Sequence, residues 1–122
     1  MAKIERFEDI NSWQKARMLS NQVYDLTENH SFAKDFDLCR QIRRAAGSVM
    51  HNIAEGFDTG SNMEFIRFLK MARRSAGEVQ SQLYLAVDRR YILAEEMQSV
   101  YDLATETKKL INGFIAYLRN QT

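Results

Sequence analysis

An unbroken seven-residue repeat of apolar residues between positions 65 and 86 constrains the fold of this chain more than any other feature. The repeat alternates steps of four and three, at Phe65, Leu69, Ala72, Ala76, Val79, Leu83 and Ala86. This spacing places every member on one side of an α-helix, where they form a seam for neighbouring helices. We therefore predict a long helix over about residues 61–90 that is packed along its whole length.

Three further segments repeat apolar residues with the helical period, and we expect helices over about residues 9–29, 35–56 and 94–119. The last is apolar over more than a narrow seam. The 122 residues include no proline and five glycines, whereas strands joined by tight turns usually need more of both. The expected fold is all-α, an antiparallel up-down-up-down four-helix bundle forming a single domain over residues 1–122. Because a slim bundle exposes surplus apolar surface, we also expect self-association.

The segment HNIAEGFDTGSNMEF, residues 51–65, joins two of these helices. We expect Gly56 to end the first helix in a left-handed conformation, and Ser61 with Glu64 to form a capping box that begins the next. Two functional alternatives exist. Glu55 beside Asn52 suggests an acid with a polar orienting group, and the turn itself suggests a DNA-binding helix-turn-helix. We favour a hairpin hinge with a structural polar cluster, since the long continuous apolar repeats indicate near-parallel packing.

Basic residues are concentrated in the middle of the chain. Residues 40–90 contain nine Lys and Arg against five Asp and Glu, whereas the flanks contain eight against eleven and the net charge is +1. At 100° per residue the middle helices direct most of these side chains away from the core, with Arg43 and Arg73 on the flanks. The candidate nucleic-acid-binding residues are Arg40, Arg43, Arg44, Arg67, Lys70, Arg73 and Arg74.

Folding the hairpin about residues 58–59 predicts that these seven side chains form one band at similar height. Arg44 is then level with Arg73, and Arg40 with Gly77 and Glu78. Such a band would attract a phosphate backbone. It could instead serve a subunit interface, or be a solvated face on which Glu78 pairs with Arg74 or Arg40.

The residues for the common enzyme and metal sites are missing from the sequence. There is no Glu-x-x-His pair, phosphate-binding loop or nucleophile elbow, and His30 and His51 have no companion ligands. Cys39, the single cysteine, fits a buried apolar role. With neither a signal peptide nor a membrane-spanning run, we expect a cytoplasmic, non-enzymatic protein without cofactor, metal or membrane partner.

The motifs together resemble the bacterial four helix bundle protein family, whose first recognised members are encoded within intervening sequences of large-subunit ribosomal RNA genes. The resemblance covers nearly the whole chain and includes Trp13–Ala16, Gln41–Ala46, Asn52–Gly56 and Ala72–Glu78. It implies a four-helix protomer in a homo-oligomeric ring, commonly a pentamer. It also implies kinship to the basic accessory proteins of diversity-generating retroelements, and hence RNA or DNA and a reverse transcriptase as partners.

Overall fold

The computed structural model of this protein describes residues 3–121, so the ends of the predicted domain 1–122 lie outside it. Four long helices dominate it: α1 (Asn11–Thr27), α3 (Phe36–Asp58), α4 (Asn62–Asp88) and α5 (Ala94–Arg119). Two short elements were not predicted, the 3-10 helix η1 (Phe7–Asp9) and α2 (His30–Ala33). The described residues contain no strand. The four long helices lie where the apolar periodicity predicts them.

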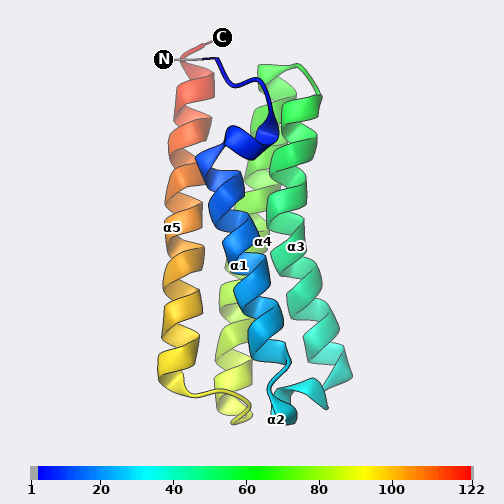
Figure 1. Cartoon of the computed structure of the whole chain (residues 1–122). Helices are drawn as coiled ribbons and strands as arrows, with labels where there is room; N and C mark the ends of the chain where they lie inside the picture. The colour runs from blue at the N-terminus through cyan, green and yellow to red at the C-terminus, as the bar shows by residue number, and fades with distance from the viewer. Residues whose placement is uncertain (1–2, 122) are drawn as a thin grey trace.

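Each long helix runs antiparallel to the one before it (Figure 1). Helix α1 packs against α3 and α5, and α4 packs against the same two helices. Helices that follow one another along the chain are thus neighbours in space, as the short connections predict. This arrangement is the up-down-up-down bundle, and it leaves α3 and α4 side by side.

The core follows the predicted apolar stripes closely. All seven repeat positions of α4 are buried, and so are the residues of the apolar stripe on α3: Leu38, Ile42, Ala45, Val49 and Ile53. The pattern drifts only near helix ends. Leu26 of α1 and Phe114 of α5 continue the apolar spacing of their helices but are only half-buried, and Ile115 is buried in place of Phe114. The stripe is therefore the reason that each helix has an inner and an outer face.

The predicted role of Gly56 is wrong. Helix α3 continues through it to Asp58, and the left-handed residue of the hairpin is Gly60, at φ 72°. Gly56 is instead buried where α3 crosses α4. A Cβ atom on Gly56 would lie 2.7 Å from Phe65 Cδ1 and 2.8 Å from Phe68 Cβ. Glycine is needed here so that the two helices can approach closely.

The capping box at the start of α4 is only half formed. Ser61 Oγ accepts a hydrogen bond from the Glu64 backbone N–H at 3.3 Å. The Glu64 carboxylate turns to Arg67, and the Ser61 N–H donates to Thr59 Oγ1. Ser61 is thus the N-cap, as predicted, but Glu64 does not reach back to it.

At the opposite end of the bundle, two loops are tied together through Asp35. Its carboxylate caps α3 by accepting from the Leu38 N–H at 3.0 Å, and it accepts from Tyr91 Oη at 2.8 Å. The Tyr91 ring stacks on Phe32 of α2, with centroids 5.3 Å apart. The Leu38 N–H and then the Tyr91 hydroxyl lower the pKa of Asp35. These contacts hold the first turn of α3 in place.

Candidate nucleic-acid interface

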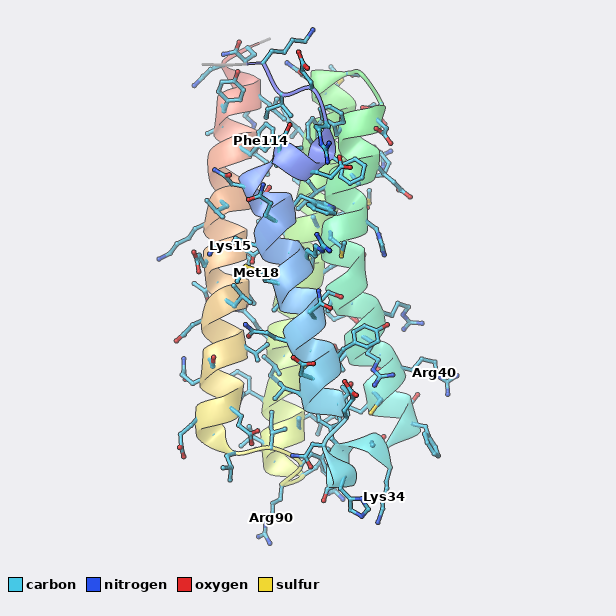
Figure 2. The ribbon with its side chains drawn as sticks, viewed as in Figure 1. Lys15, Met18, Lys34, Arg40, Arg90 and Phe114 are labelled. Atoms are coloured by element: carbon cyan, nitrogen blue, oxygen red, sulfur yellow. The ribbon has the colours of Figure 1, made fainter. Side chains whose placement is uncertain are left out.

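Three arginines lie near the start of α3, and we call them the α3 cluster: Arg40, Arg43 and Arg44. Arg40 and Arg44 are exposed, as predicted, and make no hydrogen bond or ion pair within residues 3–121. Figure 2 shows Arg40 projecting outward from the lower part of α3. Two positive charges on this face are therefore available to a ligand.

Arg43 is held by α1. Its Nε–H donates to Thr27 Oγ1 at 2.8 Å, and its guanidinium carbon lies 4.6 Å from the centroid of the Tyr24 ring. The Thr27 hydroxyl in turn donates to the Tyr24 carbonyl at 2.8 Å. Because a guanidinium has five N–H donors, the terminal nitrogens of Arg43 keep donors for a further partner. A fixed guanidinium loses less side-chain entropy on binding than a free one.

The four basic residues of α4 form a second group, which we call the α4 cluster: Arg67, Lys70, Arg73 and Arg74. Arg67 pairs with Glu64, with Nη2 and Oε1 2.9 Å apart, and covers the Phe68 ring at 4.8 Å. Arg73 Nη1 donates to Asn112 Oδ1 of α5 at 2.7 Å. Lys70 and Arg74 are exposed and make no such contact within the described chain. Two of the four side chains in this cluster, Arg67 and Arg73, therefore already have partners within the protein.

The two clusters do not form the predicted single band. Ser75 Oγ donates to Ser48 Oγ at 3.0 Å, and Gly56 lies against Phe65 and Phe68. In an antiparallel hairpin, residues in contact lie at equal distances from its middle. Both contacts therefore place the middle near residue 61 rather than at 58–59. Arg44 is therefore level with about residue 78 of α4, about one turn beyond Arg74, and the two cluster centres are about 13 Å apart along the bundle at 1.5 Å per residue.

Other predicted contacts of this region take a different form. Asn52 Nδ2 donates to the Ser48 carbonyl and to Ser48 Oγ, at 2.8 and 2.9 Å. Through Ser75 this polar group links α3 to α4, but Glu55 is exposed and is not part of it. Asn52 is therefore not oriented toward Glu55, and no pair suited to acid catalysis is assembled here. Glu78 accepts from Gln82 Nε2, and no ion pair joins it to Arg40 or Arg74 in residues 3–121.

The single cysteine, Cys39, lies in a packed environment that suits a structural role. Cys39 is buried, and its Sγ donates to the Phe32 carbonyl at 3.1 Å. Burial raises the pKa of its thiol, against the opposing effect of Arg43. Across residues 3–121, no group of three His, Cys, Asp or Glu side chains could hold a metal ion. In the same part of the chain, no helix has the length and apolar character needed to cross a membrane.

The sequence analysis missed two aromatic residues beside the α3 cluster. Phe36 is 75% exposed and Tyr24 is 45% exposed. The signal for Phe36 was its position one helical turn before Arg40, which places both on one face. No pattern along the chain could have paired Tyr24 with Arg43, because they lie on different helices.

The fold and its surface define a class of protein: a bundle of four long helices with arginine-rich outer faces on α3 and α4. The sequence matches the 23S rRNA-intervening sequence protein family over residues 8–113, and the chain belongs to that family. The predicted family resemblance is thereby confirmed.

A solved structure shares this fold. It is the crystal structure of a protein of unknown function from the S23 ribosomal protein family, from Bacteroides thetaiotaomicron VPI-5482. The two chains are 28% identical, with a TM-score of 0.78, over 85% of this chain and 97% of that one. No match is found among curated proteins.

Proposed function

We propose that this protein is a non-enzymatic, cytoplasmic nucleic-acid-binding module that holds RNA or DNA through its two basic clusters. The observation that supports this most is the set of four exposed basic side chains without an intramolecular partner in residues 3–121: Arg40, Arg44, Lys70 and Arg74. Unpaired surface cations release condensed counterions when they meet phosphates, so binding should weaken steeply with salt.

The test is binding of a labelled single-stranded RNA at two salt concentrations. Four phosphate contacts give a salt slope of about −3 for single strands, so affinity should fall about 50-fold between 50 and 200 mM salt. The double variant Arg40→Glu, Arg44→Glu should lower the slope by about half. Arg43 is left unchanged, because its contacts with Thr27 and Tyr24 also support the fold.

A matched control is the double variant Lys3→Glu, Lys109→Glu. Both lysines are exposed, line a surface recess beside α5, and belong to neither cluster. The change in net charge is the same in the two double variants. If both weaken binding equally, the clusters are not the binding site, and absence of binding at 50 mM salt would sink the proposal.

We further propose that the protein assembles as a homo-oligomeric ring, a pentamer by the family resemblance. Exposed apolar side chains on α1 and α4 favour self-association: Met18, Tyr24, Tyr84 and Leu85. Light scattering should then give about 71 kDa, five times the 14.2 kDa of one chain. A particle of 14.2 kDa contradicts the ring. If Arg40→Glu, Arg44→Glu splits the ring while the control does not, the basic residues serve subunit contacts and the protein is a scaffold.

A further inference from the structure

The edge between α1 and α3 combines positive charge with an exposed aromatic ring. Phe36, the first residue of α3, is 75% exposed. Its ring pairs with no other aromatic ring in residues 3–121. A single exposed apolar residue needs no explanation by itself. The position of the Phe36 ring, however, calls for an explanation, because Phe36 lines an open recess of about 400 Å³ together with Arg40 and Arg43.

Hydrogen bonds hold the floor of the recess and one of its walls. Thr27, Ala33 and Cys39 complete its lining. The Cys39 thiol is hydrogen-bonded to the Phe32 carbonyl, and Thr27 holds Arg43. The Tyr24 ring lies under the Arg43 guanidinium and keeps that plane in place. A planar ligand entering the recess would meet the Phe36 ring and a pre-positioned guanidinium.

Ring faces and arginine planes next to unpaired cations are the features with which proteins hold single-stranded nucleic acid. A base in a duplex is stacked on its neighbours, so its face is not available to a side chain. The α4 cluster offers no equivalent ring, because Arg67 covers Phe68. Both clusters therefore hold an arginine plane, but of the two only the α3 cluster also has a strongly exposed aromatic ring, Phe36, beside its unpaired cations.

We propose that the recess formed by Phe36, Arg40 and Arg43 binds an unpaired nucleobase, so that the protein selects single-stranded RNA or DNA over a duplex. This inference rests on the proposed nucleic-acid binding and names its substrate class. Phe36 stacks on the base, Arg43 contacts its second face or edge, and Arg40 contacts the adjoining phosphate.

The experiment uses the full chain and four probes: a labelled 20-nucleotide oligouridine RNA, the corresponding oligothymidine DNA, and an RNA and a DNA duplex hairpin of equal length. Replacing Phe36 by alanine should weaken single-strand binding about 5- to 150-fold, the range found for loss of one stacked base. Duplex binding and the salt slope should not change, because no phosphate contact is removed. Phe36→Trp should retain the affinity.

Two further measurements separate stacking from other roles. Met63, 79% exposed at the far end of α3–α4, gives the control Met63→Ala, which should bind like the wild type. In Phe36→Trp, the emission of the new tryptophan should be quenched by the oligonucleotides, against a constant background from buried Trp13. Light scattering of Phe36→Ala should be unchanged.

The outcomes distinguish the two proposals. If neither single strands nor duplexes bind the wild type, the proposed function fails and this inference fails with it. If both bind and Phe36→Ala behaves as wild type, stacking is refuted while the proposed function stands. If Phe36→Ala changes the oligomer mass, a second copy occupies the recess and the base site is refuted.

Discussion

Gly56 offers the most direct test of how α3 and α4 are held together. In Gly56→Ala the added Cβ would lie 2.7 Å from Phe65 Cδ1 and 2.8 Å from Phe68 Cβ. Two carbon atoms pack best at about 3.5–4.0 Å. Phe68 Cβ is attached directly to the α4 backbone, so relief requires the helices to move apart by several tenths of an ångström.

The alternative movement, rotation of the Phe65 ring, is also hindered. Phe65 is 7% exposed, and its ring packs edge-on against Phe57 and Phe114 at centroid distances of 6.2 and 5.1 Å. Overpacking destabilises by about 1–3 kcal/mol, and we expect the upper part of this range, about 2–3 kcal/mol, because neither Phe68 Cβ nor the Phe65 ring can rotate away. Alanine recovers about 1 kcal/mol through its higher helix propensity. We expect a net loss of about 1–2 kcal/mol, or roughly 5 °C in Tm for a chain of this length.

The assay is urea unfolding followed by circular dichroism, at one protein concentration because self-association would shift the midpoint. Gly113→Ala is the matched control. Gly113 lies within α5, and a Cβ there would meet nothing within 4 Å. That variant should be more stable than the wild type by up to about 1 kcal/mol. A Gly56→Ala protein as stable as the wild type would refute the close-approach argument.

Three further predictions concern polar groups. Ser12→Ala should leave stability unchanged or raise it by up to about 1 kcal/mol in urea unfolding, because the buried Ser12 Oγ has no hydrogen-bond partner within the described residues. Thr27→Val keeps the side-chain shape but removes the acceptor of the Arg43 Nε–H, so we expect a loss of about 1–2 kcal/mol in the same assay; no loss would mean that water replaces the bond fully. Tyr91→Phe removes a hydrogen bond that lowers the pKa of Asp35. Because this pKa is lower in the folded than in the unfolded protein, the carboxylate stabilises the fold above its unfolded pKa, and the stabilisation is lost as the pH falls through the folded pKa. The stability difference between wild type and Tyr91→Phe should therefore be largest near pH 7 and shrink below about pH 4, and a difference independent of pH would contradict this account.

The helices of this protein could be predicted because each one repeats its apolar residues with the helical period. The seam of seven residues from Phe65 to Ala86 is buried in full. Short connections then leave few ways to arrange four long helices. The outward direction of Arg40, Arg44, Lys70 and Arg74 follows from the same period, and each of these side chains is exposed.

The position of each glycine and the height of each arginine could not be predicted in this way. Gly56 and Gly60 are both plausible helix ends in the sequence, and only the close approach of Phe68 shows that Gly56 lies within a helix crossing. The predicted hinge lies a few residues too early in the sequence. Arg44 is therefore not level with Arg73, as predicted, but with about residue 78. Register between helices depends on how side chains interdigitate across the interface, which is not encoded by any local pattern.

By itself the sequence determined the all-helical class, the order and direction of the helices, the family, and which face of each of the two middle helices is basic. These properties follow from periodicity and composition, which are local. The tertiary structure alone decided the heights of the two basic clusters, the engagement of Arg73 by Asn112 of α5, and the fixing of Arg43 on Tyr24 of α1. The physical reason is that such contacts depend on which side chains two packed helices bring within about 4 Å of each other.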